Sequence, residues 1–255
     1  MNSTNTSTTL RRYNVVAGSL HAVSAIAVLA FANGFSLPVD ADYLAGAPGT
    51  TKHQLVQLFS IRMAWLVAAF FVLSAVAHFA VAGPLRARYD ARLADHQNPF
   101  RWAEYSLSSS LMIVAIAQLT GIRDVAALAA LVGVNASMIG FGWIQERYEE
   151  PGASLVPFWL GCVAGVVPWV AIGIYLIGPG AHAHAPGFVY GIYVSLFAFF
   201  NCFAIVQFLQ YRKIGRFRDY LVGEKTYLVL SLVAKSLLAW QIFASTLAAA
   251  SANAH

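Results

Sequence analysis

Long apolar runs, separated by short polar segments, dominate the pattern of this chain. Each run has about the 20 residues that a helix needs to cross a bilayer core roughly 30 Å thick. The runs cover residues 13–32, 58–82, 100–119, 125–145, 155–178, 187–210 and 226–249, with boundaries good to a few residues. Because most connections are short, the pattern predicts an all-α membrane protein, with residues 1–255 forming one bundle of seven transmembrane helices.

Two polar segments stand apart from this pattern. Residues Met1–Thr9 are polar and are expected to be disordered. The segment 34–57 is too long for a simple connection, and it is either structured, as a hairpin over the bundle or a subunit contact, or a flexible surface loop. The first run follows Arg11 and Arg12 as a signal peptide would. It is longer than a signal core of about 7–15 residues, however, and it carries His21 near its middle.

The composition fits a membrane protein and excludes several other classes. Hydrophobic residues make up 59% of the 255 positions and charged residues 11%, whereas soluble domains carry roughly 25% charged residues. A soluble enzyme, a disordered protein and a nucleic-acid-binding protein therefore all fit poorly. Cys162 and Cys202 both lie inside apolar runs and indicate no disulfide framework.

The 16 Lys and Arg residues are distributed unevenly between the two sets of polar segments. The set that includes the N-terminus holds Arg11, Arg12, Arg86, Arg88, Arg92, Arg147, Arg212, Lys213, Arg216, Arg218 and Lys225. The other set holds Lys52 and Arg123, while Arg62, Arg101 and Lys235 fall inside apolar runs. Since basic loops face the cytoplasm, we expect the N-terminus inside and the C-terminus outside the cell. This topology accounts for the net charge of +5 without a nucleic-acid partner.

Lys235 lies deep inside the last apolar run. A charge at mid-bilayer costs at least about 2.5–3.5 kcal/mol, so this lysine requires an explanation. Three explanations remain open: a packing pair with a buried carboxylate, an ion-relay lysine, or a lysine that forms a covalent Schiff base. A desolvated amine loses its proton readily and attacks aldehydes, which favours the third. Ser231, one turn earlier on the same face, is either bonded to its own helix or hydrogen-bonded to the imine.

Glu104 is the carboxylate that falls clearly inside an apolar run. Its helix face also carries Arg101 and Ser108. Glu104 is therefore either half of an interfacial ion pair with Arg101 or the counterion of a cation at Lys235. The third and seventh runs both lead from inside to outside, and side chains lean toward a helix N-terminus. Lys235 is thus expected to reach back toward Glu104.

The first two runs contribute His21 and His78, with Ser74 one turn before His78. A single buried histidine is usually an ordinary core residue. Two of them, with Glu104 available nearby, favour a polar cavity on the cytoplasmic side that holds a proton. A second group of residues either packs the bundle or lines a chromophore pocket, packing being the better interpretation for the aromatic ones. This group comprises Tyr105, Ser108, Met138, Gly142, Trp159, Phe200, Phe203 and Gln207.

Seven runs with a lysine in the middle of the last resemble a retinal-binding rhodopsin. Arg101-Trp102-Ala103-Glu104-Tyr105 resembles the microbial rhodopsin pattern of arginine, aromatic, small, acidic and aromatic residues. The expected topology is the reverse of that in ordinary microbial rhodopsins. This reversed topology and four further segments together resemble the heliorhodopsin family over nearly the whole chain. These segments are Glu104–Ser110, Gly133–Met138, Pro157–Trp159 and Ser231–Ser236.

The resemblance implies specific roles for the residues introduced above. Lys235 would carry all-trans retinal as a protonated Schiff base, with Glu104 as its sole carboxylate counterion and Ser231 hydrogen-bonded to it. The cavity that accepts the Schiff-base proton would be lined by His21, His78 and Ser74. The retinal pocket would be lined by Tyr105, Ser108, Met138, Gly142, Trp159, Phe200, Phe203 and Gln207. The resemblance further implies a homodimer in the lipid membrane, a slow photocycle and a sensory role.

Three functions compete: a light sensor, a light-driven or light-gated proton or ion transporter, and a retinal-free transporter or membrane enzyme with a relay lysine. Pumping requires proton-relay groups on both sides of the Schiff base. Ala115 stands where a pump would carry its internal donor, and beyond Lys235 we expect no buried carboxylate, only Gln118. A sensor without enzymatic activity is therefore favoured, although passive conduction stays open. The third function has no supporting motif, since we find no metal-ligand constellation, phosphate loop or nucleophile elbow.

The most basic connection runs from Arg212 to Lys225, on the expected cytoplasmic side. A buried charge change near Lys235 could shift the helices that this connection joins. The connection is then a candidate docking surface for an acidic signalling partner or for lipid. The alternative is that its charge only retains the loop on the cytoplasmic side.

Overall fold

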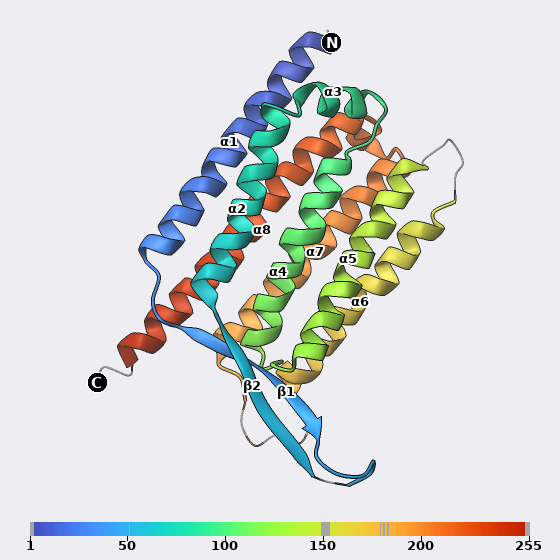
Figure 1. The fold of residues 1–255 in the computed structure, drawn as a ribbon. Coiled ribbons are helices and arrows are strands. Elements are labelled where there is room, and N and C mark those ends of the chain that lie inside the picture. The colour runs from blue at the N-terminus through green and yellow to red at the C-terminus, as the bar shows by residue number, and fades with distance from the viewer. Residues whose placement is uncertain are drawn as a thin grey trace.

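The apolar runs form long helices, and a β-hairpin connects the first two of them (Figure 1). The computed structural model describes residues 3–50, 52–148, 154–178, 180, 182 and 184–252, and the side chains of those between residues 8 and 244. In chain order the elements are α1 (Ser3–Ala30), β1 (Ser36–Leu44), β2 (His53–Arg62), α2 (Met63–Ala82), α3 (Arg86–Ala94), α4 (Pro99–Leu119), α5 (Val125–Arg147), α6 (Val156–Ile177), α7 (Gly187–Tyr211), η1 (Gly215–Arg218) and α8 (Tyr220–Ala252). The start of α1 lies with α3 at one end of the bundle, termed the α3 end. The strands lie at the opposite, hairpin end.

Six of the described helices are long and apolar enough to cross a membrane, which makes this an integral membrane protein. They are α1 over Thr8–Ala30, α2, α5, α6, α7 and α8 over Tyr220–Ala244. Helix α4 is also 21 residues long, but it carries Arg101 and Glu104. It packs against α2 on one side and α5 on the other (Figure 1). Ionisable residues of membrane helices almost always face the bundle interior, so a helix packed between others can carry them.

Three boundaries differ from those predicted from the sequence. Helix α1 begins at Ser3, so most of the segment expected to be disordered is helical. Residues 58–62 were assigned to the second transmembrane run but belong to β2, because the mixed apolar and polar residues there pair with β1. Arg62 consequently lies at the hairpin end, not inside a span. Helix α8 begins at Tyr220, more than one turn before the predicted start of its run.

The hairpin confirms the structured alternative for the long segment after the first helix. Strand β1 pairs with β2 in antiparallel register from Ser36↔Arg62 to Leu44↔His53, with an irregularity next to Asp40. The Asp40 backbone N–H donates to the Arg123 carbonyl at 2.9 Å, and the two side chains form an ion pair at 2.5 Å. The hairpin is thereby fixed to the turn between α4 and α5. Asp40 is only 4% exposed, so the expectation of no buried carboxylate toward this end was wrong.

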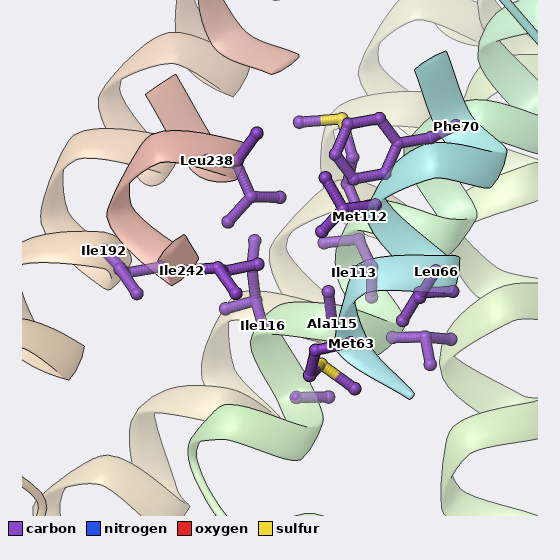
Figure 2. Close-up of a cluster of buried hydrophobic side chains, with 14 of the residues drawn as sticks. Met63, Leu66, Phe70, Met112, Ile113, Ala115, Ile116, Ile192, Leu238 and Ile242 are labelled. Carbon is purple, nitrogen blue, oxygen red and sulfur yellow. The ribbon is translucent and has the colours of Figure 1, made fainter. Parts of the chain in front are cut away.

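A cluster of apolar side chains from α2, α4, α7 and α8 lies on the hairpin side of Lys235, and Figure 2 shows part of this cluster. Ile242 of α8 lies beside Ile116 of α4, Leu238 lies one turn before Ile242, and all three are at most 1% exposed. Ala115, the residue at the expected donor position of a pump, belongs to the same cluster. Because Leu238 follows Lys235 by about one turn, the apolar cluster begins directly beyond the lysine.

Candidate functional site

Lys235 and Glu104 form a buried ion pair between α8 and α4. Lys235 Nζ donates to Glu104 Oε1 at 2.8 Å and to Ser231 Oγ at 2.8 Å. The lysine and glutamate side chains are 3% and 7% exposed. Two charges withdrawn from water in this way are stable only as a pair, because either one alone would carry the full desolvation cost. The structure therefore brings together the three residues that the sequence proposed for the Schiff-base region.

Helix α2 adds a second donor to Glu104. The Ser74 hydroxyl oxygen lies 2.6 Å from Glu104 Oε1 and 3.0 Å from the Phe70 carbonyl oxygen. A hydroxyl has one proton to donate, and the charged carboxylate is the stronger acceptor. Ser74, predicted as a member of the proton-accepting cavity, thus contacts Glu104, the predicted counterion.

Next to Lys235 lies a cavity of about 120 Å³, termed the large cavity. The predicted pocket residues that the structure brings to its wall are Tyr105, Ser108, Met138, Gly142, Phe200, Phe203 and Gln207. Trp159 is not among them, since it faces outward and is 55% exposed. Its neighbour Phe158 lines the cavity instead, because adjacent residues point about 100° apart around a helix. The assignment of Trp159 to the pocket wall is therefore corrected to Phe158.

The wall of the large cavity is mainly aromatic and apolar. The Tyr105 ring centre lies 5.5 Å from Lys235 Nζ, and the Phe203 ring meets Tyr105 edge-on at 5.4 Å. Gly142 leaves room for the ring of Trp102, because a Cβ there would lie 2.7 Å from this ring. Several further residues line the large cavity but were not predicted from the sequence to do so: Trp102, Ser109, Met112, Ile139, Gly161, Cys162, Ala204, Tyr227 and Ala234.

His21 and His78 lie together on the α3 side of the ion pair. Their rings stack in parallel with centres 5.4 Å apart. His78 Nδ1 lies 2.9 Å from Asn14 Oδ1, and the Asn14 amide nitrogen donates to the Leu10 carbonyl, which fixes the amide orientation. His78 Nδ1–H is therefore the donor. His21 is fully buried, and neither of its ring nitrogens has a hydrogen-bond partner among the described residues.

A second, small cavity of about 40 Å³ lies beside these histidines. Asn14, His78, Arg101 and Glu104 are among the residues that line it, whereas His21 is not. The small cavity therefore offers polar surface between the counterion and the α3 end, and His78 is the histidine with access to it. The small cavity lies in the region where a polar cavity was predicted. His78 faces this cavity, and His21 stacks behind His78.

Arg101 does not pair with Glu104, which settles an alternative that the sequence left open. Its guanidinium forms ion pairs with Glu146 at 2.5 Å and with Glu224. These three side chains, termed the Arg101 cluster, are between 2% and 6% exposed. Arg101 is positioned by the start of α4, where the Asn98 side chain accepts its backbone N–H at 3.0 Å and proline follows at the first helical position.

Glu146 and Glu224 were not identified from the sequence, so Glu104 is not the sole carboxylate in the long helices. Both lie within about one turn of a predicted span boundary, and these boundaries were good only to a few residues. Glu146 accepts hydrogen bonds from Trp102 Nε1 at 2.6 Å and from the Tyr220 hydroxyl at 3.0 Å. A search for buried charge one turn beyond each span would have found both carboxylates.

Comparison with known proteins places this geometry in context. The family model described as Heliorhodopsin matches residues 10–247. No curated protein matches the chain. Among solved structures, a light-driven proton pump from Leptosphaeria maculans is 13% identical, with 93% of this chain and 95% of that chain covered and a TM-score of 0.64.

Two further solved structures have a similar fold. The light-driven proton pump Coccomyxa subellipsoidea rhodopsin is 17% identical, with a TM-score of 0.63 over 92% of this chain and 96% of that chain. The transmembrane domain of Salpingoeca rosetta rhodopsin phosphodiesterase is 12% identical, with a TM-score of 0.65 over 92% and 84%. At these identities the likeness establishes the fold, and the activity has to be argued from the residues of this chain.

Proposed function

We propose that this chain, which belongs to the heliorhodopsin family, is a light sensor that carries all-trans retinal covalently at Lys235. Family membership makes it a retinal-binding photoreceptor and an integral membrane protein. The isomer, the covalent linkage and the sensory output are our proposals. The observation that carries them is the buried Lys235–Glu104 pair at the wall of the large cavity.

The residues around the large cavity fit this chromophore. Lys235 offers an amine that condenses with an aldehyde to form an imine and water. The aromatic and apolar wall suits a polyene, since such surfaces bind apolar ligands largely through burial. When bound, retinal supplies a light-driven rotation about a double bond. Glu104 holds the positive charge at the lysine nitrogen, and Ser231 orients that nitrogen through the hydrogen bond at 2.8 Å.

The proton at the lysine nitrogen has polar neighbours on the α3 side. Glu104 also lines the small cavity, which His78 and Asn14 face. We infer that the proton moves from the nitrogen into this cavity, with His78 as the accepting group and His21 stacked behind it. A return by the same route would leave no net transport.

The apolar cluster beyond Lys235 supports a sensor over a pump. Ala115, Leu238 and Ile242 offer no group that binds a proton. Asp40, the buried carboxylate at the hairpin end, is held by Arg123. A light-driven or light-gated ion transporter is the second candidate, because two of the solved structures with this fold are described as proton pumps.

We further propose that α4 is the seventh transmembrane helix and that the N-terminus lies inside the cell. Its length of 21 residues is sufficient to cross the bilayer core. Two basic segments lie at the same end of the bundle as the start of α1: α3 and the segment from Arg212 to Lys225, which includes the first turn of α8. This distribution of charge supports a cytoplasmic N-terminus. A homodimer, and an acidic cytoplasmic partner at that loop, remain proposals, and no enzymatic reaction is assigned to the chain.

The test is expression with added all-trans retinal, followed by absorption spectroscopy of the purified protein. We expect a visible band that is absent in Lys235→Ala. A wild-type protein without any visible band would contradict the chromophore assignment. Pumping is tested by illuminating cells and recording external pH, where a sustained change abolished by a protonophore would favour the transporter.

A further inference from the structure

The Arg101 cluster contacts the large cavity through two aromatic rings. The Arg101 guanidinium carbon lies 4.6 Å from the centre of the Trp102 ring and 4.3 Å from that of the Tyr227 ring. Both rings also line the large cavity. Each ring therefore has the cavity beside it and also contacts the cation, which is attracted to aromatic faces. A shift of either ring by an occupant of the cavity changes the position or the contacts of Arg101.

The carboxylates of the cluster fasten three helices at the α3 end. Glu146 lies in the last turn of α5 and Glu224 near the start of α8. The Asn98 side chain, at the start of α4, donates to Glu224 at 2.6 Å, and its backbone N–H donates to Glu146 at 2.8 Å. Tyr220, the first residue of α8, donates its hydroxyl to Glu146. The cluster thus holds the start of α8 directly after the loop that contains η1.

The connection between α3 and α4 also contacts the start of α8. The His96 ring stacks on Tyr220 with centres 5.2 Å apart. The loop between α7 and α8 therefore ends at a residue that is bonded to the cluster on one side and stacked against the neighbouring loop on the other. Anything that loosens the cluster frees the anchored end of this loop.

Burial makes the cluster sensitive to small displacements. The three side chains are almost fully withdrawn from water, and separating a buried ion pair leaves an uncompensated charge in a medium of low polarity. Packed interiors respond to such a change by switching between discrete arrangements, not by gradual deformation. The cluster is therefore a suitable two-state element between the cavity and the surface.

We propose that the Arg101 cluster couples the large cavity to the loop between α7 and α8, so that the state of the cavity sets how firmly this loop is held. The proposal rests on the proposed function, because retinal is the occupant whose change would move Trp102 and Tyr227. The loop exposes the basic side chains Arg212, Lys213, Arg216 and Arg218. The coupling would thus bring a light-dependent change to a charged surface.

Hydrogen–deuterium exchange of the full-length protein tests this coupling. Exchange of the backbone amides of residues 212–224, which are the loop and the first turn of α8, is measured without retinal, with retinal in the dark, and with retinal under illumination. In the wild type we expect the slowest exchange with retinal in the dark and faster exchange in the other two states. In Glu224→Gln the loop should exchange rapidly in all three states while the visible band is retained.

Lys225→Gln is the matched control, since it removes a charge from the adjacent residue, outside the cluster, and should leave the wild-type differences intact. If Glu224→Gln does not fold, Tyr220→Phe removes a single hydrogen bond of the cluster and should reduce the differences. If the wild-type protein with retinal shows no visible band, this result contradicts the proposed function before exchange is measured. A visible band with identical loop exchange in all three states overturns the coupling alone, as does a folded cluster variant with undiminished differences.

Discussion

Ser74 places its hydroxyl oxygen 2.6 Å from the same Glu104 oxygen that accepts the hydrogen bond from Lys235. Two donors from different helices, α2 and α8, therefore converge on one carboxylate oxygen. Hydrogen bonds to charged groups contribute about 1.5–3 kcal/mol each. We therefore expect Ser74, a residue outside the α4–α8 pair, to lower the negative charge that Glu104 presents to the lysine nitrogen.

Ser74→Ala is expected to shift the visible band of the retinal-bound protein to shorter wavelength. Without the hydroxyl, Glu104 stabilises the positive charge at the lysine nitrogen more strongly, which favours the dark ground state. The absorption spectrum in the dark measures the shift. Ser137→Ala is the control, because the Ser137 hydroxyl donates within its own helix to the Gly133 carbonyl. Identical spectra for the Ser74 variant and the wild type would contradict this tuning role.

Glu104→Gln is expected to shift the band to longer wavelength, or to release the proton from the lysine nitrogen at lower pH. The neutral amide cannot balance the buried positive charge, so the charged form loses stability. A spectroscopic pH titration distinguishes the two results. Asp42→Asn, at a half-exposed carboxylate of β1, should leave spectrum and titration as in the wild type. A Glu104 variant with both unchanged would argue against the counterion role.

Gly142→Ala should lower the thermal stability of the retinal-bound protein by about 1–3 kcal/mol, the usual cost of overpacking. The added Cβ would lie 2.7 Å from Trp102 and 3.0 Å from the Gln207 amide nitrogen. Gly133→Ala on the same helix is the matched control, because among the described residues nothing beyond the adjacent backbone of its own helix lies within 4 Å of a Cβ there. Helix propensity predicts that this control gains up to about 1 kcal/mol. Loss of the visible band on heating measures both, and equal effects would contradict the packing argument.

The Lys235–Glu104 pair could be predicted because its signal is strong in a membrane sequence. Each charge is expensive inside an apolar run, and the direction in which helical side chains lean relates the two positions. Ser231 follows from the same periodicity. These inferences depend on residue type and spacing alone, and the hydrogen bonds at 2.8 Å agree with them.

The misassigned residues share a physical cause. In a membrane helix the outward face is also apolar, so the pattern could not tell that Phe158 faces the cavity and Trp159 faces outward. Glu146 and Glu224 were missed because they lie just outside the predicted runs 125–145 and 226–249, although Arg101 compensates them inside the bundle. Residues 58–62 were assigned to a helix because Leu58, Phe59 and Ile61 at the end of β2 extend the apolar run of α2 without a break.

Tyr89→Phe tests a pH dependence at the α3 end. Tyr89 lies in α3 and is 4% exposed, and burial raises its pKa above the ordinary value, which is about 10. The folded state thus disfavours the phenolate, so this contribution to stability is complete below pH about 10 and is lost as the pH rises through the folded-state pKa. The variant should retain more of its neutral-pH stability than the wild type above this pH.

At neutral pH the same variant should lose no more than about 1 kcal/mol, since the hydrogen bond from the Asn14 amide to the Tyr89 hydroxyl is long, at 3.5 Å. Thermal unfolding of both proteins at neutral and alkaline pH gives the comparison. Tyr43→Phe in β1 is the control, because that side chain is 52% exposed and its removal should not change the alkaline profile. If the Tyr89 and Tyr43 variants lose stability in parallel with the wild type as the pH rises, burial of Tyr89 does not limit the alkaline stability of the bundle.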